Sequence, residues 1–293
     1  MNKFSGTGVA IVTPFRTDSS IDFKSLENLI ENLISNGIDY LVVLGTTGES
    51  VTLSKAEKKA VVNHVIEINS GRIPIVVGVG GNNTGEIIAQ IKKNDFVGVD
   101  AILSVAPYYN KPTQKGLILH FEMIAATSPV PVILYNIPGR TGVNMMAETV
   151  IELAHKSKNI IAIKEASGDL DQITKIMKNK PEGFQVISGD DSLTIPIIAE
   201  GGVGVVSVLA NAFPAEVSKL VSSALKGNFK EACNIHFKFT ELIDLLFIDG
   251  NPAGVKAILH QMKFISNSLR LPLTPVEKET YDKISKLILQ NLN

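Results

Sequence analysis

Eight short runs of β-branched and other apolar residues recur along this chain, and they constrain its fold more than any other feature. Their starts lie about 20 to 35 residues apart, which is the span of one strand and one crossover helix. Most runs are continuously apolar, as strands buried on both faces are. The predicted strands are Val9–Thr13, Tyr40–Leu44, Ile73–Val79, Ala101–Ala106, Pro131–Tyr135, Ile160–Lys164, Phe184–Ser188 and Val203–Val208.

The segments between these runs carry helical signals. Apolar residues at helical spacing follow Asp22 and stop before Gly37, and Ser54 with Glu57 has the spacing of a capping box. Alternating strands and helices predict an α/β fold, a closed (β/α)8 TIM barrel, with an open doubly wound sheet as the alternative. No Gly-x-Gly-x-x-Gly opens the first unit, which disfavours a dinucleotide-binding sheet.

The strand pattern stops after Gly227. Residues 228–246, 253–266 and 275–291 are helical in pattern, and the last segment has Thr274 as a cap and Pro275 at the first helical position. We therefore predict a barrel over residues 1–227, which would carry any active site, and a C-terminal domain of three helices over 228–293. No linker-like segment separates the two, so the helices are expected to dock on the barrel.

Composition excludes several classes of protein. Of 293 residues, 45% are apolar and 19% charged, and the formal charge is −1, so neither nucleic acid nor an anionic membrane is an expected partner. Every apolar run is shorter than 10 residues, and Met1–Phe15 does not resemble a signal peptide. One cysteine allows no internal disulfide, and five histidines show no metal-binding spacing. We expect a cytoplasmic protein that needs no metal.

Polar side chains gather where the predicted strands end, and in a barrel these ends form the active site. Lys164 ends the run Ile-Ile-Ala-Ile-Lys, and burial favours the neutral amine, the form that attacks a carbonyl to give a Schiff base. The alternative is a lysine that reaches solvent or pairs with Glu165. Lys256 is also flanked by apolar residues, but it lies on a predicted outer helix and is expected to be structural.

Other strand ends carry candidates with a simpler alternative each. Tyr135 is a candidate proton carrier or a ring that fills the barrel. Thr46 and Thr47 either orient a carboxylate or only form a turn. Arg140 has the chemistry to bind a carboxylate through two hydrogen bonds, although a loop arginine is more often solvated. The glycines of 201–204 fit a phosphate site or tight packing equally well.

Taken together, these residues resemble the dihydrodipicolinate synthase family, within the pyruvate-dependent class I aldolases related to N-acetylneuraminate lyase. The resemblance runs from Gly8–Phe15 through the helical tail. Gly45–Glu49 and the strand of Lys164 are shared across the superfamily and imply chemistry through a pyruvate imine. Tyr108–Thr113 and Tyr135–Thr141 look more like the synthases themselves.

The resemblance implies a lyase that condenses pyruvate with L-aspartate 4-semialdehyde, the first committed step of diaminopimelate and lysine biosynthesis. No cofactor is implied, because the imine itself is the electron sink. A homotetramer, built as a dimer of dimers, is the implied assembly. Alternatives are a lyase for sialic acid or a 2-keto-3-deoxy sugar acid, which Arg140 disfavours, and a non-catalytic binding paralogue.

The family's functional residues match positions of this chain. The implied catalytic residues are Lys164, Tyr135, Thr46 and Tyr109, and the implied substrate-binding residues are Thr47, Arg140, Gly189 and Val206. Lys164 would form the imine and Tyr135 would carry protons. Thr46 would link Tyr135 to Tyr109 of a neighbouring subunit. Thr47 would hold the carboxylate of pyruvate, and Arg140 that of the semialdehyde.

Two departures from the family pattern affect regulation and the tail. Lysine-inhibited members have histidines where this chain has Lys55 and Lys58, although Ser50, Asn82, Glu86 and Tyr108 match the effector pocket. Two ammonium groups repel a cationic effector, so we predict weak or absent inhibition by lysine. Residues 250–256 match the family's tail motif only in part, which leaves the packing of the tail open.

Overall fold

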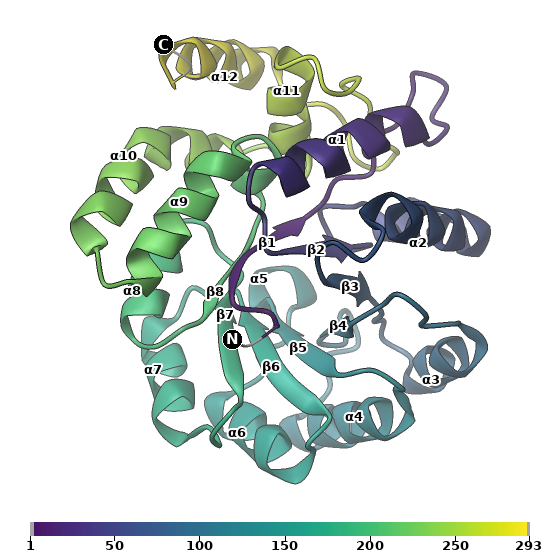
Figure 1. Ribbon diagram of the computed structural model, residues 1–293. Coiled ribbons are helices and arrows are strands. Elements are labelled where there is room, and N and C mark those ends of the chain that lie inside the picture. Colours follow the sequence, from purple (N-terminus) through teal and green to yellow (C-terminus); the bar gives the residue numbers. More distant parts are fainter. Residues whose placement is uncertain (1–2, 292–293) are drawn as a thin grey trace.

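The computed structural model describes residues 3–291 and contains a closed barrel of eight parallel strands, hydrogen-bonded in the order β1 to β8 (Figure 1). Pairing of β1 with β8 closes the barrel, so the sheet is not the open alternative. The strands are β1 (Gly6–Ala10), β2 (Tyr40–Val43), β3 (Ile75–Gly78), β4 (Ala101–Val105), β5 (Val132–Asn136), β6 (Ile160–Glu165), β7 (Gln185–Ser188) and β8 (Gly204–Ser207).

Helices form a ring around the barrel and cover its strands (Figure 1). They are α1 (Phe23–Ser35), α2 (Lys55–Asn69), α3 (Thr84–Lys93), α4 (Gln114–Thr127), α6 (Ala147–Lys156), α7 (Leu170–Asn179), α8 (Thr194–Ala199) and α9 (Pro214–Leu225). Short helical turns lie in the loops η1 (Ser50–Thr52), α5 (Pro138–Thr141) and η2 (Leu209–Asn211). Two predicted helix starts are confirmed by their caps. The Asp22 side chain accepts from the Ser25 N–H, and Ser54 and Glu57 form the capping box.

The first strand begins three residues earlier than predicted. Its first residues, Gly6 and Gly8, are not apolar, but they pair with Gly204 and Val206 of β8. A Cβ on Gly204 would lie 1.9 Å from the carbonyl oxygen of Gly6, so only glycine allows the two strands to approach here. A close backbone contact, rather than hydrophobicity, fixes the start of β1, and hydropathy did not reveal it.

Alternate residues of each strand point to opposite sides of the barrel wall. Ile133 and Tyr135 of β5 and Ala162 of β6 belong to the cluster inside the barrel. Their neighbours Leu134 and Ile163 belong to the larger cluster between strands and helices. This alternation decides which polar residues at the strand ends face the interior.

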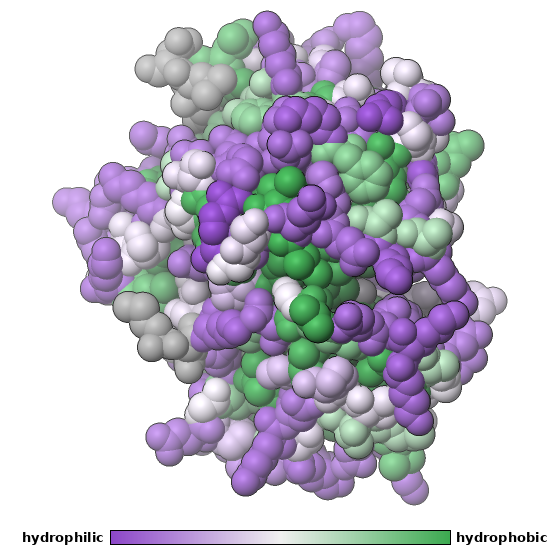
Figure 2. Space-filling model, turned by 45° about the vertical axis from the view of Figure 1, so that its right-hand side comes forward, coloured by the Kyte–Doolittle hydropathy of each residue, from purple (hydrophilic) through white to green (hydrophobic). Residues whose placement is uncertain are grey.

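The amino-terminal end of the barrel is filled by side chains. Phe4 is buried and meets Tyr40 edge to face, with ring centroids 5.7 Å apart. On the face seen in Figure 2, hydrophilic side chains cover most of the surface, with hydrophobic residues between them. Within residues 3–291, none of the helices combines the length and apolar character that crossing a membrane requires.

Three helices follow the barrel, as predicted: α10 (Phe229–Leu245), α11 (Ala253–Gln261) and α12 (Lys278–Asn291). Helix α10 packs against α9, and α12 packs against α10 and α11 (Figure 1). The predicted cap at Thr274 and Pro275 is wrong, because α12 starts at Lys278. The residue before it, Glu277, donates its N–H to the Asp249 side chain. The domain boundary after Gly227 stays a prediction, and residues 1–2 and 292–293 lie outside the described residues.

Candidate active site

Lys164 and Tyr135 lie side by side near the carboxyl ends of β6 and β5. The two residues are register partners across the parallel pair, and both side chains point into the barrel. The Lys164 Nζ lies 4.3 Å from the centroid of the Tyr135 ring. Only 5% of each residue's surface is exposed, so Lys164 does not reach out to solvent. The barrel interior therefore holds an amine beside a phenol, as the sequence predicted.

Glu165 faces away from Lys164, on the outer side of the same strand. Its carboxylate accepts hydrogen bonds from Asn136 Nδ2 at 3.1 and 3.2 Å, from Gln172 Nε2 at 3.2 Å and from the Ser167 N–H at 2.8 Å. Burial raises the pKa of Glu165, and these bonds oppose the rise. The alternative of a Lys164–Glu165 pair is therefore wrong, because strand alternation separates the two groups. No ion pair among residues 3–291 involves Lys164.

Gly189 follows β7 and lies beside the lysine, and Val206 lies on β8. A Cβ on Gly189 would come within 2.9 Å of the Lys164 Cε and 2.8 Å of the Ala166 Cβ. A side chain at this position would displace the lysine, so glycine preserves the space next to it. Val206 is buried in the interior cluster and forms part of the wall.

The loop after β2 carries both predicted threonines. Thr47 is buried, and its Oγ1 accepts a hydrogen bond from Asn251 Nδ2 at 3.0 Å. Thr46 is half-buried, and its carbonyl accepts from the Glu49 N–H at 3.0 Å. Among the hydrogen bonds of the described residues, none joins Thr46 to Tyr135 or to Tyr109. The proton relay implied by the resemblance is not assembled within one chain.

Tyr109 and Arg140 are the two exposed members of the predicted set. Tyr109 is 89% exposed, and its backbone has a φ of 72°, a left-handed conformation that costs energy for a tyrosine. Its N–H donates to the Thr141 carbonyl, which ties this loop to α5. Arg140 lies on α5, and its Nη2 donates to the Asn251 carbonyl at 3.4 Å.

The C-terminal segment approaches the site more closely than the sequence indicated. Lys256 is fully buried, although an outer helix was predicted, and its Nζ lies 2.5 Å from Glu49 Oε1 and 3.0 Å from the Ser268 carbonyl oxygen. The expected structural role fits this pairing. Sequence reasoning missed Asn251, which contacts both Thr47 and Arg140. Its only local signal was its place in the partly matching tail motif.

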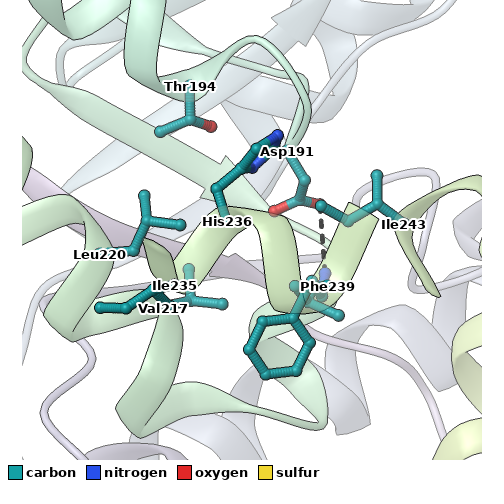
Figure 3. A pocket seen from close by; sticks show the side chains of 9 residues that line it. Asp191, Thr194, Val217, Leu220, Ile235, His236, Phe239 and Ile243 are labelled. Carbon is teal, nitrogen blue, oxygen red and sulfur yellow. Dashed lines mark hydrogen bonds between the residues drawn. The ribbon is translucent and has the colours of Figure 1, made fainter. Parts of the chain in front are cut away.

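A small cavity of about 10 Å³ lies apart from this site, where α10 covers the loop after β7 (Figure 3). It is lined by Asp191, Thr194, Leu220, His236 and Phe239, among others. Burial raises the pKa of Asp191, whose carboxylate accepts hydrogen bonds from Ser207 and from two backbone N–H groups that follow β8. Through these hydrogen bonds the Asp191 carboxylate connects the loop after β7 to the loop after β8. The cavity has room for one water molecule at most.

The reactive group that the interior site offers is the amine of Lys164. Within the described part of the chain, no group of three or more His, Cys, Asp or Glu side chains is placed to hold a metal ion. A buried lysine at the end of a barrel strand, beside a tyrosine and without a carboxylate partner among the described residues, is an arrangement that can form an imine with a carbonyl compound.

Comparison with known proteins names the family. The model of the Dihydrodipicolinate synthetase family matches residues 3–291, and the chain belongs to that family. The 4-hydroxy-tetrahydrodipicolinate synthase of Parabacteroides distasonis is 53% identical over 98% of this chain and 97% of its own. The family resemblance drawn from the sequence is thereby confirmed.

Two solved structures are similar over nearly their whole length. One is a chloride-inhibited dihydrodipicolinate synthase from Acinetobacter baumannii complexed with pyruvate. It is 39% identical, with a TM-score of 0.94 and coverage of 97% of this chain and 98% of that one. The other, from Cyanidioschyzon merolae, has lysine bound. It is also 39% identical, with a TM-score of 0.95 and coverage of 99% and 98%.

Proposed function

We propose that this protein condenses pyruvate with L-aspartate 4-semialdehyde to 4-hydroxy-tetrahydrodipicolinate, through an imine formed on Lys164. This is the reaction of a lyase at the first committed step of diaminopimelate and lysine biosynthesis. The observation that carries the proposal is the buried amine of Lys164, which no carboxylate of the described residues neutralises. The chain that holds this amine belongs to the Dihydrodipicolinate synthetase family.

The reaction begins at the amine. The lone pair of Lys164 Nζ attacks the keto carbon of pyruvate, water leaves, and a cationic carbon–nitrogen double bond forms. Loss of a methyl proton then moves an electron pair onto the nitrogen and gives an enamine. The phenol of Tyr135 is the group we assign to these proton transfers, since its ring centroid lies 4.3 Å from Nζ. The imine is the electron sink, so no cofactor takes part.

The second half joins the substrates. The enamine carbon attacks the aldehyde carbon of L-aspartate 4-semialdehyde, and the aldehyde oxygen takes a proton. The amine of that substrate then attacks the imine carbon, closes the ring and releases Lys164 as a free amine. We assign the pyruvate carboxylate to Thr47 and the semialdehyde carboxylate to the exposed guanidinium of Arg140. Gly189 and Val206 line the pyruvate pocket in this assignment.

We further propose that the site is completed by a second copy of the chain. Tyr109 is 89% exposed and its backbone is held in an unfavourable conformation, an arrangement that suits a side chain offered to a neighbour. Thr46 would then connect Tyr135 to the partner's Tyr109, in a tetramer built as a dimer of dimers. Mixing Tyr109→Phe subunits with Lys164→Ala subunits should restore activity in hybrids, and verified hybrids without activity would contradict this assignment.

The function is tested with the wild-type enzyme. Borohydride in the presence of pyruvate should add a stable mass to Lys164, located by mass spectrometry of peptides. Turnover should require L-aspartate 4-semialdehyde as the aldehyde, and N-acetylmannosamine or a sugar aldehyde should not replace it. Absence of labelling would favour the binding paralogue, and turnover with a sugar aldehyde would favour the sugar-acid lyase. We place the enzyme in the cytoplasm on its single cysteine and its family.

A further inference from the structure

Asn251 is buried where the segment between α10 and α11 meets the loop after β2. Its side-chain Nδ2 donates to Thr47 Oγ1 at 3.0 Å, across 204 residues of sequence. Its backbone carbonyl accepts from Arg140 Nη2 at 3.4 Å. One residue outside the eight strands therefore contacts both groups to which we assign a substrate carboxylate.

The direction of the Asn251–Thr47 bond determines what the Thr47 hydroxyl offers. A threonine hydroxyl has one proton to donate and two lone pairs to accept with. Because Asn251 donates to Thr47, one lone pair is occupied and the proton stays free. Among the hydrogen bonds of the described residues, Thr47 Oγ1 donates none. A carboxylate in the barrel is the acceptor that this free O–H would suit.

Other contacts hold the Asn251 segment in place without the Asn251 amide. Lys256 pairs with Glu49, which stands two residues after Thr47, and the Arg270 N–H donates to the second Glu49 oxygen at 3.1 Å. The Arg270 guanidinium also binds the Thr52 carbonyl at 3.0 Å. These contacts join parts of the C-terminal region on either side of α11 to the loop after β2 without the Asn251 amide, which leaves that amide available for orienting Thr47.

We infer that Asn251 is a positioning residue for the keto-acid substrate: its amide fixes the Thr47 hydroxyl so that the proton points at the pyruvate carboxylate. This inference rests on the proposed function. It predicts an effect on one substrate only, because the contact with Arg140 comes from the Asn251 backbone and survives replacement of the side chain.

The experiment measures KM for each substrate and the pyruvate dependence of borohydride labelling, in the full-length protein. In Asn251→Ala, both the KM for pyruvate and the pyruvate concentration for half-maximal labelling should rise about 10- to 100-fold, the loss of one hydrogen bond to a charged group. The KM for the semialdehyde and kcat should change less than about 3-fold. A structural role would instead change both KM values or kcat.

Two further variants test the route through Thr47. In a Thr47→Val background, Asn251→Ala should cause no additional loss, because the hydroxyl that it orients is absent. Asn251→Asp fits the same space, but its carboxylate accepts a hydrogen bond from the Thr47 hydroxyl instead of donating one to it. It should therefore raise the KM for pyruvate at least as much as Asn251→Ala does. It also serves as the test if the alanine variant does not fold.

Each outcome is decisive. An unchanged KM for pyruvate in folded Asn251→Ala or Asn251→Asp overturns the inference, and so does an equal rise for both substrates or an additive loss in the double variant. If wild-type Lys164 is not labelled at all, the proposed function fails. If wild type is labelled and the variants show the same pyruvate dependence, only the role of Asn251 fails.

Discussion

The molecule contains two buried lysines in nearly the same aromatic setting but in different regions. Inside the barrel, Lys164 Nζ lies 4.3 Å from the centroid of Tyr135, and at the junction with the C-terminal helices Lys256 Nζ lies 4.3 Å from the centroid of Phe15. Lys256 also has a carboxylate partner, Glu49, at 2.5 Å. No carboxylate partners Lys164 within the described residues.

The difference shows that burial alone does not make a lysine a nucleophile. Burial lowers the pKa of Lys256 to about 8, even though Glu49 favours the charged form. Its ammonium contacts Glu49 and the Ser268 carbonyl, and in this charged form the nitrogen has no lone pair with which to attack a substrate. At Lys164 the neighbouring carboxylate is turned outward by strand alternation, and space beside the amine is kept open by Gly189.

Removing the amine inside the barrel should produce the largest effect on activity. We expect Lys164→Met to lose turnover by on the order of 10⁴-fold or more, as loss of a covalent nucleophile does. Borohydride labelling should disappear as well. The unfolding midpoint should stay close to that of wild type, because no buried carboxylate loses its partner. Persistent labelling in this variant, measured by intact mass, would show that another lysine forms the imine.

Removing the amine at the junction should instead affect stability. Lys256→Met leaves the buried Glu49 carboxylate without its ammonium partner, and we expect the free energy of unfolding to fall by about 3–5 kcal/mol. The control is Lys256→Met with Glu49→Gln, which removes both charges and should recover at least half of the loss. Urea unfolding at a single protein concentration measures the free energy of unfolding of the single and the double variant. A mild effect of the single variant, or no recovery, would contradict a pairing role for Lys256.

A third pair, at the rim of the same junction, should show a smaller effect that depends on pH. A hydrogen bond from Arg270 lowers the pKa of Glu57 to about 2, from an ordinary value of 4.5. A carboxyl with a lowered pKa stabilises the folded protein above pH 4.5 and loses this contribution as pH falls towards 2.

At pH 7, Glu57→Gln should cost about 1 kcal/mol, since 32% of the Glu57 side chain is exposed and solvent weakens the pair. The difference from wild type should shrink between pH 4.5 and 2, because Glu57 of the unfolded chain becomes protonated in this range while the folded carboxylate stays charged down to about pH 2. Stability measured across this range is the test. If the difference in free energy of unfolding between wild type and Glu57→Gln stays constant down to pH 2, Arg270 does not hold the carboxylate in its charged form.

The smallest expected effect concerns two lysines at the start of α2. Lys55 is exposed and Lys58 half-buried, and burial together with Lys55 lowers the pKa of Lys58. Two ammonium groups within about 6 Å of a cationic effector cost about 1–3 kcal/mol each. We therefore expect less than about 2-fold inhibition by millimolar L-lysine at low pyruvate. Lys55→Gln with Lys58→Gln should increase sensitivity, and strong inhibition of wild type would show that both side chains turn away.

Local patterns predicted the barrel and the interior residues, because both follow from short-range physics. Continuous apolar runs mark strands buried on both faces, and the ends of such runs made Lys164 and Tyr135 candidates for the site. Which face Lys164 takes was left open and is decided by the alternation along β6. What the patterns did not predict were contacts between distant segments. The bond between Thr47 and Asn251, the partner of Lys256, and the glycine contact that starts β1 leave no local period in the sequence.

The contacts of residues 251 and 256 with the loop after β2 also have a consequence for the order in which the chain folds. The β2 loop emerges from the ribosome about 200 residues before the segment that orients and neutralises it. Until that segment arrives, Glu49 has no ammonium partner and the Thr47 hydroxyl has no donor, so the site should bind pyruvate weakly although the strands of the barrel are all present. Closing so long a loop is slow. Tight binding of pyruvate during synthesis should therefore appear only after residues 251–256 have docked, later than the hydrogen-bonded barrel itself.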